Sequence, residues 1–540
     1  MNRLYRFVIL VLLLSPAVTL AAEPLRPKLL LMITVDQLRA DMAEPLKQRF
    51  SDEGFRYLME RGTLFSNAHY RHANTLTAVG HATLFTGGHT PQHGMAGNYW
   101  YDAAAGRTVY CVADPDHPII DTPGGGGISP VNLTAPTIGD ALIAASSNRA
   151  RVFSVSGKDR GAVIPGGHQG KAFWYSARNG HFVSSTYYYD AYPAWVKHWN
   201  DANQADHYRS APWTLLHDAD TYIHATEDDR PAEQPVGELG RTFPHPAARS
   251  YSILRFTPMA DELLLDFVTT LMKEEQVGRG PDTDLLAVSF SATDYIGHMY
   301  GPNSLEAEDN LLRLDLTLAR LLRLVDQQVG LDNTLIVLSS DHGVDAIPEY
   351  RTQQGLPAGR LTPEKLVADL NRLLRERLSI SDNLITQYWH PNIYLDTERI
   401  KALHLEVTAI EELLAEELSK MPAIRQAVTR TALLRGDTGS DPLAASLLNA
   451  FHPTRSGNLL IIPEQYWNLN ADSDIAAAHG SPYTYDTHVP ILFAGPRIPA
   501  QRVARSVSPA DIAVTLARLL NIPAPAGATG QPLAEVLHNH

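Results

Sequence analysis

The stretch Leu285-Leu-Ala-Val-Ser-Phe290, followed by Asp294-Tyr-Ile-Gly-His298, decides the fold that this chain is expected to adopt. Its first part is a short apolar run, which indicates a buried β-strand. Helical spacing over Leu305–Val329 and a second apolar run, Leu335–Leu338, come next. Two strands joined by a crossover helix form a βαβ unit, so the sequence predicts an α/β fold with a mostly parallel sheet.

Carboxylate and imidazole side chains stand next to four apolar runs of this kind. They are Asp36 after Leu29–Val35, Asp294 and His298 after Leu285–Phe290, Asp341 and His342 after Leu335–Leu338, and His488 before Val489–Ala494. One such residue is more often a helix cap or a loop residue, but in open α/β sheets ligand sites form outside the carboxyl ends of the strands. The pattern therefore predicts a site for two divalent ions, with zinc as the expected metal and manganese or iron as alternatives. A two-metal site of this kind indicates hydrolysis of a phosphate ester.

The composition is that of a globular protein and excludes one class of partner. The 540 residues are 44% hydrophobic and 19% charged, with 45 basic and 59 acidic residues and a net charge of −14. Nucleic acid is not expected as a partner, because binding it needs a basic face. A small-molecule phosphate ester is compatible with this charge, because bound metal ions supply local positive charge. Cys111 is the only cysteine, so no intramolecular disulfide can form, and the sequence does not indicate an oligomeric state.

The N-terminus has the pattern of a signal peptide. Arg3 and Arg6 precede the apolar run Phe7–Leu14, and small residues follow it. The apolar run is too short for a stable membrane anchor, and an uncleaved membrane helix or a buried helix is the alternative. We expect residues 1–22 to be a signal peptide and the mature chain, residues 23–540, to be periplasmic or secreted.

Two segments interrupt the expected α/β domain. Residues from about 166 to about 249 are rich in Tyr, Trp, His and Gly and show little periodicity, which indicates an irregular insertion over the site. Residues from about 350 to about 480 combine helical patterns with short apolar runs. This second segment is expected to form a small α+β cap between Asp341 and His488.

The segment Asn74-Thr-Leu-Thr77-Ala-Val-Gly-His81 contains the candidate nucleophile. A threonine at the start of a helix is ordinarily an N-cap, but a hydroxyl bound to a divalent ion becomes an effective nucleophile. Backbone N–H groups at a helix N-terminus would face the same phosphate, and Gly80 permits close approach of the backbone. Thr75 is a rival, and we favour Thr77 because only Thr77 has the Thr-x-x-x-His spacing to His81.

Three further polar residues are candidates for contacting phosphate oxygens. Asn98, in a glycine-rich loop, offers an amide donor, although a turn residue is the competing interpretation. Lys158 and Arg160 come just after Val152–Ser156, which is expected to form a short buried strand, and a solvated turn is the alternative interpretation. Lysine provides a point charge and arginine a bidentate fork, and both suit phosphate.

Together these motifs resemble the alkaline phosphatase superfamily, in the branch of threonine-nucleophile alkaline phosphatases related to nucleotide pyrophosphatase/phosphodiesterases. The resemblance covers about Lys28 to about Leu533. It implies a three-layer sandwich around the mostly parallel sheet, with the small cap inserted. It also implies one zinc ion held by Asp294, His298 and His488, and a second held by Asp36, Asp341, His342 and Thr77. Phosphate oxygens would be bound by Asn98, Lys158 and Arg160.

The resemblance implies hydrolysis of phosphate monoesters through a phosphothreonine intermediate. A monoester dianion has three free oxygens and more charge than a diester, so the pair Lys158 and Arg160 favours monoesters. A phosphodiesterase or nucleotide pyrophosphatase of the same superfamily is the alternative. A sulfatase is excluded, because Cys111 is followed by Val-Ala-Asp-Pro rather than by the pattern Cys/Ser-x-Pro-x-Arg. An exported ligand-binding protein, an alternative from another class, would need neither a nucleophile nor paired metals.

Overall fold

The computed structural model describes residues 26–225, 228–469 and 474–537. The predicted signal peptide, residues 1–22, lies outside the described residues. Among the residues that are described, no helix is both long and apolar enough to cross a bilayer.

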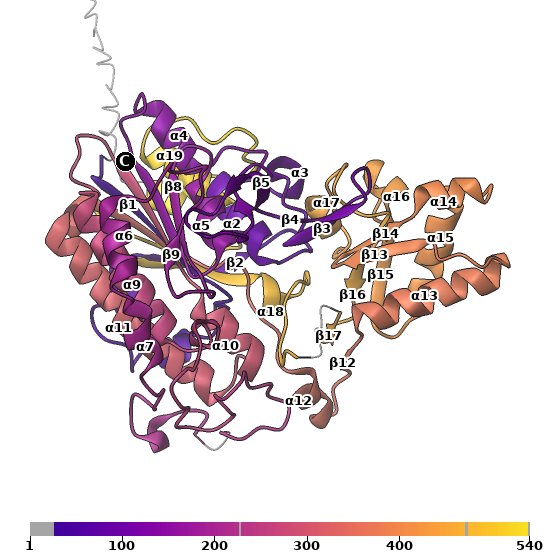
Figure 1. Cartoon of the computed structure of the whole chain (residues 1–540), viewed down its shortest axis with the longest axis horizontal. Coiled ribbons are helices and arrows are strands. Elements are labelled where there is room, and N and C mark those ends of the chain that lie inside the picture. Colours follow the sequence, from indigo (N-terminus) through magenta and orange to yellow (C-terminus); the bar gives the residue numbers. More distant parts are fainter. Residues whose placement is uncertain (1–25, 226–227, 470–473, 538–540) are drawn as a thin grey trace, which may run out of the picture.

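A nine-stranded sheet forms the centre of the structure (Figure 1). Its strands are ordered β19-β2-β18-β11-β1-β10-β7-β8-β9. In this order they comprise Gln501–Val503, Thr63–His69, His488–Ala494, Thr334–Ser339, Leu29–Val35, Asp284–Phe290, Val152–Ser156, Lys171–Tyr175 and Phe182–Val183. β1 pairs in parallel with β10 and β11, and β7 and β8 continue the parallel run, whereas β18 and β9 pair antiparallel with their neighbours. The predicted α/β fold with a mostly parallel sheet is confirmed.

Helices cover both faces of this sheet, because its central strands are apolar on both sides. Alternate side chains of β1 enter two different cores, Leu29, Leu31 and Ile33 on one face and Leu30 and Met32 on the other. The first layer contains α1 (Phe55–Arg61), α9 (Met259–Glu274) and α11 (Leu305–Gln328), and the second contains α2 (Thr77–Thr86), α4 (Ile138–Ala145) and α19 (Asp511–Leu519). α11 connects β10 to β11 as the predicted βαβ unit requires, although β1 lies between these two strands. The structure is therefore the predicted three-layer sandwich.

A second, smaller sheet lies apart from the first, toward the right of Figure 1. Its four antiparallel strands are ordered β13-β14-β16-β15 and comprise Ile385–Trp389, Asn392–Leu395, Leu459–Pro463 and Ile424–Thr429. The helices α13 (Pro363–Leu378) and α15 (Val407–Leu418) pack on this sheet around a core of their own. We call residues 359–468 the cap, and they lie within the segment predicted as an α+β insertion at about 350–480.

The segment predicted as an irregular insertion, about 166–249, begins instead with two strands of the central sheet. These strands are β8 and β9, whose shortness and aromatic content hid them in the sequence. The chain that follows is mostly loops and short helices. Trp199 and Trp213 of this segment are buried in the main core, so they stabilise packing rather than line a cleft.

The remaining helices and strands among the described residues are short. The helices are α3 (Thr90–His93), α5 (Asp159–Gly166), α6 (Ala194–Asp201), α7 (Gln204–Arg209), α8 (Tyr251–Leu254), α10 (Ala292–Tyr300), α12 (Pro348–Gln353), α14 (Thr397–Ala402), α16 (Arg430–Leu434), α17 (Ser446–Ala450), α18 (Thr484–Thr487) and α20 (Ala534–Leu537). Three strand pairs are β3 (Tyr99–Asp102) with β4 (Arg107–Tyr110), β5 (Ala113–Pro118) with β6 (Gly127–Ile128), and β12 (Gly359–Arg360) with β17 (Trp467–Asn468).

Candidate active site

The carboxyl ends of three neighbouring strands bring the predicted acidic residues together. Asp36 follows β1, Asp341 lies just beyond β11, and Asp294 is in the first turn of α10, which begins after β10. These strands are adjacent and parallel in the order β10-β1-β11, so their ends meet at one edge of the sheet. The three residues are at most 2% exposed. His298 lies one turn after Asp294 on α10, and its Nε2 is 3.3 Å from Asp294 Oδ1.

Two clusters of ligand atoms, each spanning no more than 4.8 Å, share one carboxylate: Asp294 with His298 and His479, and Asp294 with Asp36 and His342. In the first cluster, His298 Nδ1 donates a hydrogen bond to the carbonyl of Ala477 at 2.7 Å. His479 Nδ1 donates to the carbonyl of Thr75, also at 2.7 Å. Since each Nδ1 carries the proton, the lone pair of each Nε2 is available to a metal ion.

Asp341 adjoins the second cluster. His342 Nε2 lies 3.5 Å from Asp36 Oδ1 and 3.4 Å from Asp341 Oδ2. His342 Nδ1 donates to the carbonyl of Gly343 at 3.0 Å, which leaves Nε2 as the ligand atom. The rings of His342 and His479 stack with their centroids 3.5 Å apart. The two clusters therefore form one continuous site.

His488 lies in neither cluster, contrary to the sequence prediction. It is the first residue of β18, and its Nε2 donates to the carbonyl of Ser66 on the neighbouring strand β2 at 2.9 Å. Its ring also stacks on His69 of β2, with centroids 4.6 Å apart. Strand pairing thus directs the imidazole toward β2, and His479, from the loop before α18, stands in the first cluster instead. No strand of the described chain adjoins His479, so the pattern of ligands beside apolar runs does not extend to it.

Thr77 lies at the start of α2 with its hydroxyl facing the second cluster. Its Oγ1 is 3.4 Å from His342 Nε2, and the residue is 1% exposed. Leu76 occupies the N-cap position of α2, so the capping interpretation of Thr77 does not apply. The hydroxyl of the rival, Thr75, donates to the carbonyl of Ser481 at 2.9 Å and is committed to that loop.

Gly80 and His81 fix α2 against the backbone that follows β11. A Cβ atom on Gly80 would lie 2.0 Å from the carbonyl oxygen of Asp341, so only glycine allows this approach. His81 Nδ1 lies 3.0 Å from the carbonyl oxygen of Thr77 and 3.3 Å from Asp341 Oδ2, and His81 Nε2 lies 3.0 Å from Ser289 Oγ. These contacts set the position of α2 and hence direct Thr77 toward the clusters.

Gln37 is a further residue of the site that sequence motifs did not reveal. Its side-chain Nε2 donates to Asp294 Oδ1 at 2.9 Å, and its backbone N–H donates to Asp341 Oδ1 at 3.1 Å. It therefore orients two of the candidate ligands. A neutral amide carries no recognisable signal in the sequence beyond its place after Asp36.

Asn98 and Arg160 have N–H groups suited to an anion. Asn98 Oδ1 accepts a hydrogen bond from the N–H of Ala78 at 3.0 Å, which holds its amide group at the same end of α2 as Thr77. Arg160 is half-buried in the first turn of α5, and its Nη1 donates to the hydroxyl of Tyr110 at 3.4 Å. Within the described part of the chain, Arg160 Nε has no hydrogen-bond partner.

Lys158, predicted to bind phosphate, contacts carboxylates in this structure. Its Nζ lies 2.6 Å from Asp36 Oδ2 and 2.5 Å from Asp294 Oδ2. Burial, with the nearby charges of Asp294 and Asp341, raises the pKa of Asp36 well above its usual value. Burial also opposes ionisation of Asp294, but Lys158 and His298 outweigh it and hold the pKa of Asp294 well below its usual value. The single ammonium group of Lys158 contacts two of the three buried carboxylates and cannot balance all three, so the donor set fits additional cations.

The class of protein follows from this arrangement. An α/β sandwich carries adjoining carboxylate–imidazole clusters at the ends of parallel strands, and a buried threonine at a helix N-terminus faces them. These are the features of the alkaline phosphatase superfamily in its threonine-nucleophile branch.

The chain belongs to the type I phosphodiesterase / nucleotide pyrophosphatase family, whose model matches residues 30–488. It is 33% identical over 519 residues to the alkaline phosphatase PhoV of Synechococcus elongatus, covering 95% of this chain and 93% of PhoV. A Myroides odoratus protein named calcium-transporting ATPase is also 33% identical, over 96% of each chain. The alkaline phosphatase PafA of Elizabethkingia meningoseptica is 32% identical, over 95% of each chain.

The crystal structure of PafA has the same fold. It superposes with a TM-score of 0.91 at 32% identity and covers 96% of this chain and 100% of PafA. A second PafA structure, with a TM-score of 0.90, is of a variant with substitutions at a threonine, an asparagine, a lysine and an arginine. The threonine and the asparagine are separated along PafA as Thr77 and Asn98 are here, and the lysine and the arginine as Lys158 and Arg160 are.

Proposed function

We propose that this protein is a zinc-dependent alkaline phosphatase that hydrolyses small phosphate monoesters through a phosphothreonine intermediate on Thr77. The observation that carries the proposal is the Thr77 hydroxyl, buried at the N-terminus of α2 and 3.4 Å from His342 Nε2. Similarity to PhoV and PafA, both named alkaline phosphatases, supports it. The same similarity argues against an exported ligand-binding protein.

The proposed ligand set divides between two zinc ions. Asp294, His298 and His479 would hold one ion, and Asp36, Asp341, His342 and Thr77 would hold the other. Carboxylate oxygens and imidazole nitrogens are ordinary zinc donors. The Nδ1 of each of these three histidines donates to a backbone carbonyl, which is the usual way in which a metal-binding imidazole is oriented. When bound, the ions would supply positive charge at the phosphate and lower the pKa of the threonine hydroxyl.

Thr77 would act in two steps. Its hydroxyl would lose its proton to solvent, Oγ would attack phosphorus, and the P–O bond to the alcohol would break. The phosphoryl group is then on Thr77, and the leaving alkoxide takes a proton from water. The positive end of the α2 dipole lies at that phosphate, and Asn98 and Arg160 donate hydrogen bonds to its oxygens. Lys158 would exchange its carboxylate partners for a phosphate oxygen once those carboxylates hold metal. Water then hydrolyses the phosphothreonine and inorganic phosphate is released.

Trapping the intermediate tests the role of Thr77. Protein quenched with substrate at low pH should carry a phosphate on Thr77, as read by mass spectrometry. Thr77→Ala should remove most of the activity, and Thr77→Ser should retain a measurable part because the hydroxyl survives. Thr75→Ala is the matched control and should have a much smaller effect. A phosphate on Thr75, or on no residue, would show that the nucleophile is wrongly assigned.

Removing the metal tests the ligand set. A chelator should abolish turnover and added zinc should restore it, because the single charge of Lys158 cannot replace two divalent ions at the phosphate. Full activity of verified metal-free protein would contradict the proposal. Restoration by manganese or iron but not by zinc would change the identity of the metal and leave the ligands in place.

A phosphodiesterase is the second candidate function, because the matching family model describes type I phosphodiesterases and nucleotide pyrophosphatases. Lys158 and Arg160 favour monoesters, whose additional charge they would match. Turnover of a phosphate monoester and of a diester, measured on one preparation, distinguishes the two candidates. A higher kcat/KM for the diester would overturn the assignment to monoesters.

We also propose that residues 1–22 direct export and that the mature chain, residues 23–540, acts in the periplasm or outside the cell. The basic and apolar pattern from Arg3 to Leu14 supports this proposal. N-terminal sequencing of protein recovered from each cell fraction tests both the cleavage site and the location. We propose further that residues from about 350 to about 480 are an insertion in the catalytic domain, and that the irregular insertion predicted at about 166–249 begins only after β9.

A further inference from the structure

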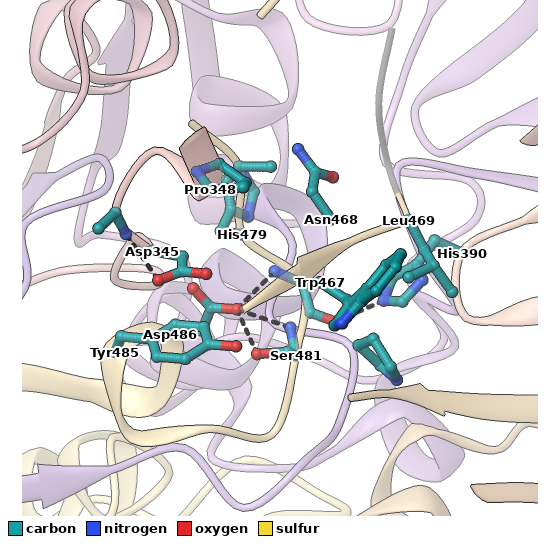
Figure 2. A pocket seen from close by; sticks show the side chains of 14 residues that line it. Asp345, Pro348, His390, Trp467, Asn468, Leu469, His479, Ser481, Tyr485 and Asp486 are labelled. Atoms are coloured by element: carbon teal, nitrogen blue, oxygen red, sulfur yellow. Dashed lines mark hydrogen bonds between the residues drawn. The ribbon is translucent and has the colours of Figure 1, made fainter. Parts of the chain in front are cut away.

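A pocket beside His479 is lined both by the cap and by the α/β part of the chain that carries the candidate active site, here called the catalytic domain. Figure 2 shows His479, Ser481 and Asp486 of the catalytic domain facing Trp467 and His390 of the cap. His390 lies in the turn between β13 and β14 and is buried. The loop that carries His479 thus lies beside a cap residue, His390, that is distant from it in sequence.

The backbone on the C-terminal side of His479 is held from both sides of this pocket. Asp486 Oδ2 accepts hydrogen bonds from the N–H of Gly480 at 3.0 Å, and from the N–H and the hydroxyl of Ser481 at 2.8 and 2.6 Å (Figure 2). On the other side, His390 Nε2 donates to the carbonyl of Gly480 at 2.6 Å. The peptide unit between Gly480 and Ser481 is therefore fixed at both its C=O and its N–H. Gly480 has a φ of +126°, which only glycine adopts readily. Because glycine has no side chain, these hydrogen bonds are what restrains its backbone.

The hydrogen bonds of His390 define its tautomer. A carbonyl oxygen only accepts, so His390 Nε2 carries the proton that is donated to Gly480. Burial lowers the pKa of His390 to about 4, so the ring is neutral and Nδ1 is an acceptor. The hydroxyl of Tyr388 donates to this Nδ1 at 2.8 Å. Two cap residues thus form an ordered chain of hydrogen bonds that ends one residue from His479.

We propose that His390 is a positioning residue through which the cap holds His479 in the geometry that zinc requires. The inference rests on the proposed function, because it takes His479 as a zinc ligand. His479 has its own hydrogen bond to Thr75, which sets its ring orientation. His390 fixes the adjoining backbone and hence the point from which that ring extends. Mutating a residue that orients a metal ligand without touching the metal typically weakens metal affinity by about 10- to 100-fold.

The test compares two substitutions at one position. His390→Leu fills the site but removes the donor, and it should raise the Kd for Zn²⁺ by about 10- to 100-fold, measured by competition with a chromogenic chelator. Its lost turnover should return when zinc is added in excess. His390→Gln can place an amide N–H near the original Nε2 position, so it should restore zinc affinity close to that of the wild type. Tyr388→Phe removes only the hydroxyl that orients His390, and it should shift the Kd in the same direction by a smaller factor.

Two controls separate positioning from stability and from the proposed function. Leu374→Ala opens a cavity in the core of the cap, at a residue that does not line the pocket, and should lower Tm while leaving the Kd for Zn²⁺ unchanged. If His390→Leu lowers Tm like this control but leaves the Kd unchanged, the inference is wrong. If His390→Leu does not fold, an unchanged Kd for Tyr388→Phe refutes it instead. His479→Ala is the second control, because an unaltered Kd for that variant would show that the proposed ligand set has failed rather than the role of the cap.

Discussion

Substituting alanine for either of two histidines, His479 or His488, tests the ligand set that the structure defines. Both belong to the same stretch of chain, and the sequence alone favours His488 as the zinc ligand. The structure places His479 Nε2 3.6 Å from Asp294 Oδ1, whereas His488 Nε2 is bound to the carbonyl of Ser66. His479→Ala should therefore damage catalysis, and His488→Ala should damage stability.

The two substitutions should affect different quantities, kcat/KM for His479→Ala and the free energy of unfolding for His488→Ala. Loss of a zinc ion that stabilises developing charge costs several kcal/mol of transition-state stabilisation. At about 4 kcal/mol, kcat/KM for His479→Ala falls by roughly three powers of ten. His488→Ala removes one hydrogen bond and the ring stack on His69. Its free energy of unfolding should fall by about 1–3 kcal/mol with kcat/KM nearly unchanged.

The assay combines three measurements on each variant: zinc content after dialysis, kcat/KM for a phosphate monoester, and unfolding by urea. His479→Ala should lose zinc and activity while its unfolding free energy, measured on metal-free protein, stays close to that of the wild type. Loss of zinc and activity in His488→Ala, with both retained in His479→Ala, would refute the structural assignment and restore the sequence prediction.

Three further outcomes are expected. Replacing Lys158 and Arg160 together by alanine should lower kcat/KM for a monoester by roughly two to four powers of ten and much less for a diester; an equal loss for both substrates would indicate a general role in binding or folding. Gly80→Ala would place a Cβ 2.0 Å from the carbonyl oxygen of Asp341. It should therefore lower the unfolding free energy by about 1–3 kcal/mol or more and also reduce activity. A soluble, fully active variant would contradict that packing. Burial raises the pKa of Glu233 from 4.5 to about 9, so the folded state keeps a proton that the unfolded state releases, and the unfolding free energy falls as pH rises between these values. Glu233→Gln should flatten that dependence in urea titrations, and an unchanged slope would argue against the raised pKa.

The site residues that lie at the ends of parallel strands could be predicted from the sequence, because each follows an apolar run. Apolar runs followed by acidic residues located Asp36, Asp294 and Asp341, because parallel strands bring their carboxyl ends to one edge of the sheet. Thr77 was recognisable from its motif, and the structure places it at a helix start beside His342.

Other features depend on contacts that no local pattern encodes. His488 adjoins an apolar run, but β18 is antiparallel to its neighbours and the pairing with β2 turns the side chain toward that strand. His479 is held in place by Thr75, which is distant in sequence. The ion pairs of Lys158 reflect the balance of buried charge at the site rather than a motif. The position of β1 between β10 and β11 is likewise a property of the whole sheet.

That position of β1 has a consequence for the timing of folding in the cell. β1 ends at Val35, but its two neighbours end at Phe290 and Ser339. At a synthesis rate of roughly 5–20 residues per second, an apolar strand waits about 15–60 s before both partners have been made. Pairing over such long separations is also slow once the partners exist. The segment Leu29–Val35 therefore stays unpaired through much of synthesis and is a candidate for chaperone binding, and the centre of the sheet cannot form before Ser339 has been made.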